Sequence, residues 1–403
     1  MATPTPAASP TATPTASPTA TPTPTPQVTL KQPDGGAGYY GQFTSQLPSD
    51  PAYFPIGVWL ESADSQANID RDKDVGLNLY VGVACPECTD MSRLRTSGMH
   101  ALIQANERTR FNGFGFETAG WLLADEIDMQ QGPAACEGSL QTIKNGLPQD
   151  GRARYNNYGK GVMWWQTDAE AACFVEAQNL VSNDIYWFTD PNEASRPGYR
   201  VAASYGMTVD RMRFLDGMDG QRKPIWNFVE VGWPFTESAS QGARAIQPAE
   251  LRAAVWHSII AGARGIIYFN HNFGGPCQSQ HVLRDSCGAA IRPAVKAVNA
   301  QIKSLAPVLN ANTVEGLVST PAQVRTIAKY QGGKFYVLAG NETNQARAAT
   351  FDVPCVGDAT VTVLDEGRTI PLIGGRFSDS FADGNAVHVY RIDGGSTCGL
   401  PPS

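Results

Sequence analysis

The chain has 403 residues, of which 42% are hydrophobic, and a formal net charge of −7 with an isoelectric point near 5.3. An acidic chain lacks the basic stripe that nucleic acids require, and no apolar stretch reaches the ~18 residues of a membrane span. We therefore expect no nucleic-acid or membrane partner, and favour a soluble monomer that acts on a neutral ligand.

The first residues differ in composition from the rest of the chain. Residues 1–29 consist of Thr-Pro, Ala and Ser repeats, and the first charged side chain is that of Lys31. A segment with so few apolar side chains cannot offset the entropy of ordering, and its prolines stiffen it into a spacer. We predict a disordered linker over residues 1–29, and favour a tether to a further module over a tail without a role.

Short apolar runs then alternate with helix-like segments from residue 54 to about residue 310. The runs are 54–60, 76–83, 100–105, 121–124, 153–157, 184–188, 225–231 and 265–270. Eight strands with helices between them, over about 250 residues, predict a (β/α)₈ barrel, which we assign to residues 30–311. No Gly-x-Gly-x-x-Gly follows the first run, which counts against a dinucleotide-binding fold.

The clearest helix of this region is predicted over residues 248–262. Pro248 suits a first helical turn, and the carboxylate of Glu250 favours the positive end of the helix dipole. Leu251, Val255 and Ile259 recur at helical spacing on one face.

The eight cysteines fall into neighbouring pairs along the chain. The pairs are Cys85/Cys88, Cys136/Cys173, Cys277/Cys287 and Cys355/Cys398. An even count indicates disulfides and an oxidising compartment, so we expect a secreted protein with the last three pairs bonded. Cys85 and Cys88 have the spacing of half a zinc site, but no second half follows, so a short-loop disulfide or two free thiols is favoured over a metal.

From residue 312 to residue 403 the pattern changes to short alternating runs separated by Gly, Asn and Asp. The runs are 324–328, 334–338, 348–353, 359–364 and 386–390. This pattern predicts a small antiparallel β-sandwich. We favour a packing role for this domain over ligand binding, because its sequence shows no obvious chemistry.

Acidic residues stand at the ends of several predicted barrel strands, where barrel enzymes place their working groups. They are Glu61, Asp125, Glu126, Asp128, Asp190 and Glu230. A carboxylate that ends an apolar strand is costly to bury unless a site uses it, and Glu126 and Glu230 both stand in such runs. Hydrolysis of a glycosidic bond needs two carboxyl groups, one to protonate the leaving oxygen and one to attack the sugar or activate water.

The barrel resembles the retaining glycoside hydrolases of clan A, on the segments 120–128, 155–161, 182–186, 223–232 and 264–269. That resemblance implies a glutamate acid/base on the fourth strand, Glu126, and a glutamate nucleophile on the seventh, Glu230. It also implies a hydrogen bond from Tyr186 to Glu230. Asp125 occupies the place of the asparagine usual in the clan and is expected to bind a substrate hydroxyl. Asp128 is the main rival to Glu126, since residues two apart share a strand face.

Aromatic and polar side chains near the predicted mouth are expected to bind sugar rings, which stack on aromatic faces. With Asp125 and Tyr186, the expected substrate-binding residues are Trp59, Asn157, Trp164, Trp165, Trp233 and His271. No metal or organic cofactor is expected. Because an acid must hold its proton while a nucleophile is ionised, we predict a raised pKa for Glu126.

The sequence thus predicts a retaining β-glycoside hydrolase that acts on a plant or microbial cell-wall polysaccharide. The linker then suggests a tethered carbohydrate-binding module. One alternative is a non-catalytic carbohydrate-binding protein on a barrel scaffold, which Asp125 in place of asparagine keeps open. Another is a barrel hydrolase or lyase of a different class, which the few histidines at strand ends disfavour.

Overall fold

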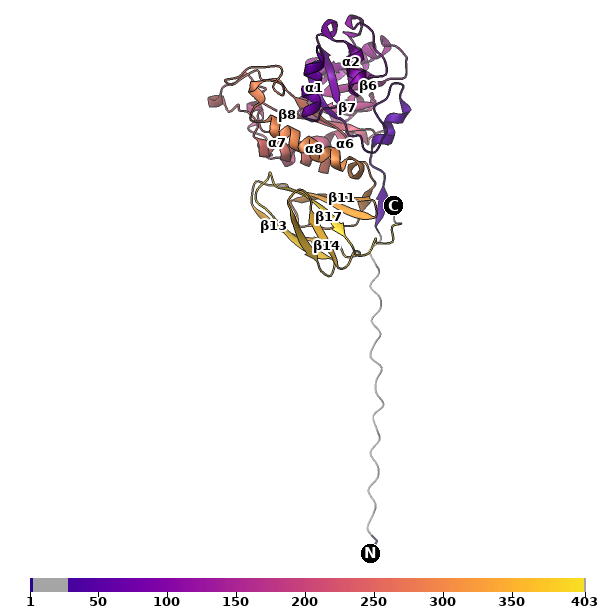
Figure 1. The fold of residues 1–403 in the computed structure, drawn as a ribbon, viewed down its shortest axis with the longest axis vertical. Coiled ribbons are helices and arrows are strands. Elements are labelled where there is room, and N and C mark those ends of the chain that lie inside the picture. Colours follow the sequence, from indigo (N-terminus) through magenta and orange to yellow (C-terminus); the bar gives the residue numbers. More distant parts are fainter. Residues whose placement is uncertain (3–27, 402–403) are drawn as a thin grey trace.

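A computed structural model of the chain describes residues 1–2 and 28–401. A closed barrel and an antiparallel β-sheet region are stacked on one another, with α6, α7 and α8 next to the sheets (Figure 1). This is the predicted fold class, a (β/α)₈ barrel followed by a β-sandwich. Most of the predicted linker over residues 1–29 lies outside the described residues.

The barrel consists of eight parallel strands that pair in chain order and close through β2 and β9. The strands are β2 (Ile56–Ser62), β3 (Leu79–Ala84), β4 (His100–Gln104), β5 (Thr118–Asp125), β6 (Ala153–Tyr158), β7 (Leu180–Asn183), β8 (Ile225–Glu230) and β9 (Ile266–Phe269). The helices are α1 (Gln66–Asp74), α2 (Met91–Thr96), α3 (Ile127–Gln130), α4 (Gln141–Asn145), α5 (Asp168–Glu176), α6 (Ala203–Asp216), α7 (Pro248–Ile260) and α8 (Arg292–Leu309).

Large side chains fill the barrel, so it is a packed core and not a pore. Trp226 and Tyr155 pack inside with ring centroids 5.5 Å apart, and Trp59 packs on Phe228 at 5.4 Å. The indole Nε1 of Trp226 donates to the hydroxyl of Tyr40, 3.2 Å away, which satisfies a polar group that burial would otherwise leave unpaired.

One strand lies earlier in the sequence than expected. The predicted sixth strand, residues 184–188, is wrong: β7 is Leu180–Asn183, which pairs with β6 and β8. The run 184–188 is apolar for another reason, because Ile185, Trp187 and Phe188 are buried in the connection that follows the strand. As a result, Asp184 and the residues after it lie beyond the carboxyl end of β7, where side chains can reach the barrel mouth.

The predicted helix after β8 is confirmed, although α7 ends at Ile260. Pro248 is its first residue, and the side chains of Gln247 and Glu250 form a capping box at its start. α7 is buried along nearly its whole length because it lies between the barrel and the sheet region: Arg252 donates to the carbonyl of Val387 at 3.3 Å.

The C-terminal region has a seven-stranded sheet, in the order β1-β10-β11-β12-β17-β14-β15, and a separate pair, β13-β16. Its strands are β1 (Thr29–Lys31), β10 (Thr313–Glu315), β11 (Val324–Gln331), β12 (Lys334–Asn341), β13 (Arg347–Asp352), β14 (Ala359–Val363), β15 (Arg368–Leu372), β16 (Arg376–Phe381) and β17 (Val387–Asp393). Stacked rings of Phe351 and Phe377, 4.5 Å apart, pack in the core of this region.

Sequence patterns did not indicate β1, β10, β15 or β16. β15 contains Pro371, which lacks the N–H of a central strand, and the strand accordingly lies at the sheet edge. β1 is short, with only Leu30 between two polar residues, and it pairs with β10 from the other end of the chain. A local pattern cannot predict such a distant pairing.

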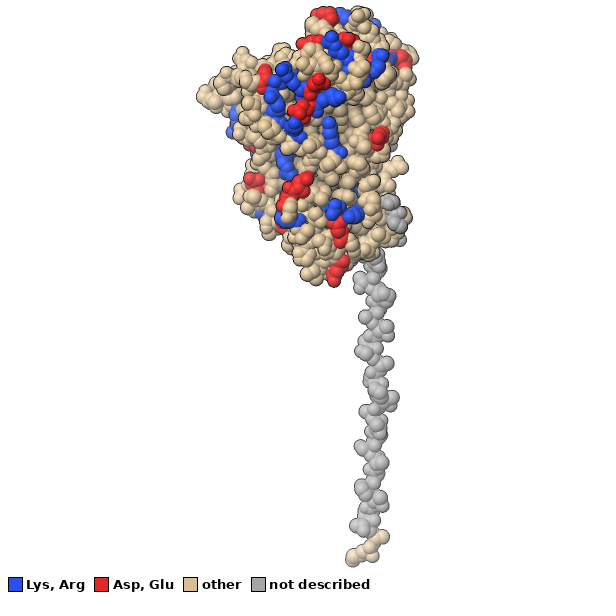
Figure 2. Space-filling model, in the orientation of Figure 1, with Lys and Arg blue, Asp and Glu red and all other residues tan. Residues whose placement is uncertain are grey.

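All eight cysteines form disulfides, in the four pairs that neighbour one another in sequence. The three expected bonds are confirmed, and of the alternatives for Cys85 and Cys88 the short-loop disulfide is the one observed. Within residues 1–2 and 28–401, no helix combines the length and apolar character needed to cross a membrane. On the face shown in Figure 2, basic and acidic side chains are interspersed.

Removing a disulfide should destabilise the protein more when the bond closes a longer loop, with a logarithmic dependence on loop length. The Cys355–Cys398 bond spans 43 residues and the Cys277–Cys287 bond spans 10. We expect double Cys→Ser variants to lower the free energy of unfolding by about 4 and about 3 kcal/mol, respectively, because longer loops lose more chain entropy when closed. Urea denaturation of the two variants measures this difference, and a larger loss for the shorter loop would contradict it.

Candidate active site

The carboxyl end of β5 places two acidic residues at the barrel mouth. Asp125 is the last residue of β5, and Glu126 follows it with a φ of 46°. A glutamate in this left-handed conformation is strained by about 1 kcal/mol or more, and such strain clusters at functional sites. The Glu126 backbone N–H donates to the carbonyl of Asn157 on β6 at 3.1 Å, which fixes the turn.

Asn157 connects the ends of three neighbouring strands. Its Nδ2 donates to the Asp125 carboxylate at 3.0 Å, and its Oδ1 accepts from the hydroxyl of Ser182 on β7 at 2.7 Å. The Ser182 hydroxyl also lies 2.6 Å from that of Tyr155. This chain of hydrogen bonds orients Asp125. Asn157, which was predicted to bind substrate, is buried and uses its side chain for these bonds within the protein.

A third carboxyl group, that of Asp184, lies beside Glu126. The charge of Glu126 acts on the buried Asp184 carboxyl group, and Tyr186 donates to Oδ2 of Asp184 at 3.3 Å. Asp184 was not among the predicted site residues, because its position was assigned to the start of a strand. The available signal was the polar run Ser182-Asn183-Asp184 directly after the apolar pair Leu180-Val181.

Burial and mutual repulsion raise the pKa values of these three carboxyl groups. Burial, followed by the charges of Asp125 and Asp128, raises the pKa of Glu126 to about 7. Burial raises the pKa of Asp125 to about 6, against the opposing hydrogen bond from Asn157. The pKa of Asp184 lies well above its usual range, because its carboxyl group is buried next to Glu126 and Asp125. Such a cluster holds protons at neutral pH and can donate one.

Asp128, the alternative to Glu126 as acid/base, has a structural role. It is 1% exposed, and its carboxylate accepts hydrogen bonds from the backbone N–H groups of Gly159 and Val162, the latter at 2.8 Å. These bonds hold the segment after β6 against the start of α3. Asp190 forms an ion pair with Lys160 at 2.6 Å, and Glu61 forms an ion pair with Arg284 at 2.8 Å.

Glu230, at the end of β8, is in a different environment from the other three carboxyl groups. It is 0% exposed, and its two oxygens accept hydrogen bonds from Thr189 at 2.9 Å and from Tyr205 of α6 at 2.6 Å. Burial raises its pKa to about 7, although these two hydroxyls act in the opposite direction. The structure therefore holds Glu230 within the protein and does not present it at the surface of the mouth.

Tyr186 lies between Glu230 and the carboxyl cluster. The expected hydrogen bond from Tyr186 to Glu230 is replaced by the bond to Asp184. This change follows from the earlier end of β7, which brings Asp184 next to the tyrosine hydroxyl. The pKa of Tyr186 is nevertheless raised by burial and by all four carboxylates, those of Asp184, Glu126, Asp125 and Glu230.

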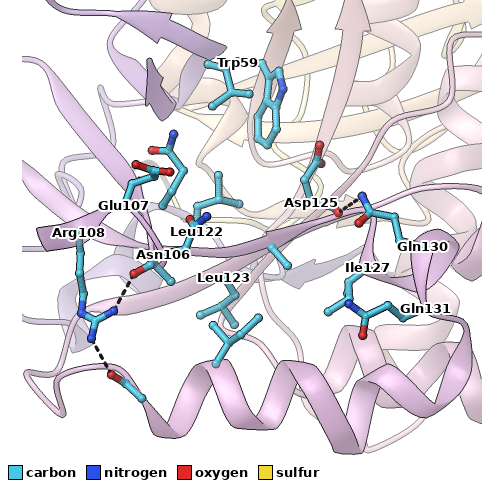
Figure 3. A pocket seen from close by; sticks show the side chains of 16 residues that line it. Trp59, Asn106, Glu107, Arg108, Leu122, Leu123, Asp125, Ile127, Gln130 and Gln131 are labelled. Carbon is cyan, nitrogen blue, oxygen red and sulfur yellow. Dashed lines mark hydrogen bonds between the residues drawn. The ribbon is translucent and has the colours of Figure 1, made fainter. Parts of the chain in front are cut away.

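A cavity of about 600 Å³ opens beside Asp125 (Figure 3). Trp59 and Leu122 form part of its wall, and Gln130 donates from its side chain to the Asp125 carbonyl at 3.1 Å. The Arg108 guanidinium is bonded to the carbonyls of Ala105 and Gly146, so it supports the wall. Trp59 itself is 4% exposed, which makes it part of the barrel core as well as of the wall.

The other predicted tryptophans differ in exposure. Trp165 is 58% exposed and free to stack on a ring, whereas Trp164 packs edge-on against Trp187 with the Arg196 guanidinium 3.7 Å from its ring centroid. Trp233 is half-buried, and its Nε1 donates to the carbonyl of Glu237 at 3.2 Å.

An aromatic cluster that the sequence analysis missed surrounds His271. The ring of Phe269, at the end of β9, lies 5.1 Å from Tyr186 and 5.1 Å from His271, and Phe273 lies 5.7 Å from His271. Phe273 is 40% exposed, so the cluster reaches the surface. The alternation Phe269-x-His271-x-Phe273 was the available signal, since residues two apart share a face in extended chain.

Comparison with known proteins shows similarity at the level of fold. A scan of protein-family models finds no match, and a search of curated proteins finds no similar sequence. Among solved structures, AmyP in complex with maltose has a TM-score of 0.54 at 9% identity, covering 89% of this chain and 99% of that chain. A glycoside hydrolase of family 5 from Bacteroides vulgatus ATCC 8482 has a TM-score of 0.52 at 12% identity, covering 85% and 90%.

Eubacterium rectale Amy13B is similar to the same degree, with a TM-score of 0.51 at 9% identity and coverage of 90% of this chain and 99% of that chain. The expected resemblance to TIM-barrel glycoside hydrolases is thus confirmed for the fold. Identities this low leave the roles of individual residues to be argued from the site itself.

The raised pKa of Glu126 predicts a pH-dependent effect of its substitution on stability. The stability that neutral Glu126 contributes is present below its unfolded pKa of about 4.5 and is lost as pH rises through about 7. Glutamine cannot ionise, so we expect Glu126→Gln to gain about 2 kcal/mol over the wild type between pH 4.5 and pH 8. Urea denaturation at both pH values measures the gain.

The exposed Glu137 supplies the control for this comparison, since Glu137→Gln should show no such change with pH. A difference between Glu126→Gln and wild type that stays constant from pH 4.5 to pH 8 would show that folding does not raise the pKa of Glu126.

Proposed function

We propose that the chain is a glycoside hydrolase that cleaves a polysaccharide with retention of configuration, with Glu126 as acid/base and Glu230 as nucleophile. The observation that carries this proposal is the cluster of Asp125, Glu126 and Asp184 at the carboxyl ends of β5 and β7, of which Asp125 lines an open cavity. Protonation of a glycosidic oxygen requires a carboxylic acid that keeps its proton near neutral pH, and burial among other carboxyl groups supplies this property.

Glu126 is suited to both proton transfers of a double displacement. Its neutral form would protonate the leaving oxygen, and the resulting carboxylate would then take a proton from the water that releases the sugar. The positive charge of Lys160 lowers the pKa of Glu126, which opposes the effect of the neighbouring carboxylates. The ionised form of Glu126 is therefore also accessible near neutral pH. Asp125, held by Asn157, would accept a hydrogen bond from a substrate hydroxyl.

Glu230 must be ionised and must reach the sugar to act as nucleophile. Thr189 and Tyr205 both donate to its carboxylate, which favours the ionised form. Since Glu230 is fully buried, attack also requires the side chains that cover it to move on substrate binding. We place Tyr186 among them, because its hydroxyl is within the electrostatic reach of Glu230 and of the acid cluster.

The surroundings of the site support a polymeric, neutral substrate. Trp165 and Phe273 are exposed rings near the predicted mouth, and Asp125 lines a cavity of about 600 Å³, large enough for more than one sugar ring. We also propose that the substrate is a β-linked cell-wall glycan and that a carbohydrate-binding module is tethered to the chain. The same proposal includes a secreted monomer, since four disulfides fit an oxidising compartment.

The complete burial of Glu230 favours one alternative, a carbohydrate-binding protein without catalysis. In that case the wild type would release no reducing sugar from a panel of polysaccharides, and Glu126→Gln would bind glycan as tightly as the wild type. Release of sugar by the wild type eliminates this alternative.

Substituting Glu126 should remove acid catalysis while leaving binding in place. We expect Glu126→Gln to lower kcat/KM by about 10²–10⁴ on a polysaccharide substrate, the usual contribution of a general acid. The loss should be smaller on an aryl glycoside with an acidic leaving group, because that oxygen needs little protonation. Equal losses on both substrates would contradict an acid role, and Glu137→Gln is the control for unrelated effects.

Trapping the covalent intermediate tests the nucleophile. A fluorinated mechanism-based sugar slows release of the glycosyl-enzyme, so the labelled residue can be identified by peptide mass spectrometry. We expect the label on Glu230. Label on Asp184 or Asp125 would refute this assignment and would place the nucleophile within the acid cluster.

A further inference from the structure

A cavity of about 220 Å³ lies at the opposite end of the barrel from the carboxyl cluster, between the barrel and the sheet region. Arg264, which directly precedes β9, and Arg213 of α6 line it from the barrel side. Lys329 of β11 and Glu315 of β10 line it from the sheet side, and Lys31, the last residue of β1, and Asp34 close it. Figure 1 shows β11 facing the layer of α6 and α8 in this region.

Two of these cations are buried with neutral partners. Arg264 is 5% exposed and donates to the carbonyl of Leu309 at 2.7 Å and to the side-chain oxygen of Asn310. Lys329 is 3% exposed and donates to the Ala311 carbonyl at 3.1 Å and to the Thr313 hydroxyl at 3.0 Å. Among the described residues, neither has an ion pair within 4.0 Å, although a buried charge is normally paired.

Nearby carboxylates are already shared among other cations. Asp34 lies 3.8 Å from Lys31 and 3.9 Å from Arg222, and Asp216 lies 3.1 Å from Arg213 and 3.2 Å from Lys223. Glu315, which also lines the cavity, lies 4.0 Å from Lys31. The lining cations are Lys31, Arg213, Arg264 and Lys329, which outnumber the lining carboxylates Asp34 and Glu315, so the cavity keeps an excess of positive charge.

The charges also repel one another. Burial, and then the charge of Arg264, lower the pKa of Lys329 to about 7, and Arg213 adds to the effect of burial on Arg264. An arginine cannot relieve this repulsion by losing its proton at neutral pH. In addition, the buried Nε of Arg264 has no hydrogen-bond partner among the described residues, so the hydrogen-bonding capacity of this guanidinium is not satisfied by the protein.

We propose that this cavity binds a small tetrahedral oxyanion, such as inorganic sulfate or phosphate, which joins the barrel to the sheet region. The proposal rests on the two unpaired buried cations, the unsatisfied Nε of Arg264 and a volume that admits such an ion, and it does not depend on the proposed catalytic function. An anion held by Arg264 and Lys329 would bind only the docked arrangement of the two regions, and would therefore stabilise it.

Thermal unfolding with sulfate tests the proposal. At equal ionic strength, 10 mM sodium sulfate should raise the Tm of the wild type by about 3 °C more than sodium chloride does. Lys329→Met should lose this sulfate-specific increment while its Tm in chloride stays equal or rises, because a buried unpaired charge is removed. The exposed lysine of α8 supplies the matched control, Lys296→Met, which should keep the full increment.

A sulfate increment that is equal in the wild type and in Lys329→Met would overturn the proposal, as would an increment no greater than that of chloride. A sulfated monosaccharide that stabilises as well as inorganic sulfate would identify an attached sulfate ester as the occupant, and would overturn the assignment to a free ion.

Crystals of the wild type soaked in selenate give a second test, independent of any variant. An anomalous selenium peak between Arg264 and Lys329 is the expected result. Its absence at 10 mM selenate would overturn the proposal even if Lys329→Met fails to fold.

Discussion

The burial of several carboxyl groups at one end of a closed barrel is the constraint on which the rest of the site depends. Desolvation opposes ionisation of Asp125, Glu126 and Asp184, and their mutual repulsion acts in the same direction. The fold tolerates this because Asn157 and Tyr186 hold the oxygens in place. The left-handed turn at Glu126 adds local strain. A packed barrel with a hydrophobic interior is the stable framework that offsets these costs.

Two environments for carboxyl groups coexist at this barrel end. The acid cluster contains like charges that share few donors, so it retains protons. Glu230 instead accepts from two hydroxyls, those of Thr189 and Tyr205, which stabilise negative charge. Burial nevertheless outweighs these two hydrogen bonds, so the pKa of Glu230 is raised to about 7, as is that of Glu126. For one to act as acid and the other as base at the same pH, substrate binding must move the two pKa values apart. Tyr186 interacts with both environments: its hydroxyl donates a hydrogen bond to Asp184, and the charge of Glu230 raises its pKa.

The sequence was sufficient for features that local patterns and counts determine. Seven of the eight barrel strands were predictable from apolar runs, and three disulfides from the spacing of their cysteines. Features set by distant contacts were not predictable. The apolar pattern of residues 184–188 predicted a strand, but these residues are apolar because they are buried in the connection after β7. A buried connection and a buried strand require the same kind of residue, so the pattern does not distinguish them. Asp184 was missed for this reason, and the donors to Glu230 come from Thr189 and from α6, which no pattern near Glu230 indicates.

The position of β1 has a consequence for the order of assembly. Thr29, Leu30 and Lys31 pair with Glu315, Val314 and Thr313, so the first strand of the folded chain adds to a sheet whose other members are all made last. During synthesis this strand has no partner until the ribosome has produced the whole barrel and β10. Its docking is therefore a late step that joins residues on either side of the whole barrel, and contacts between such distant residues form slowly.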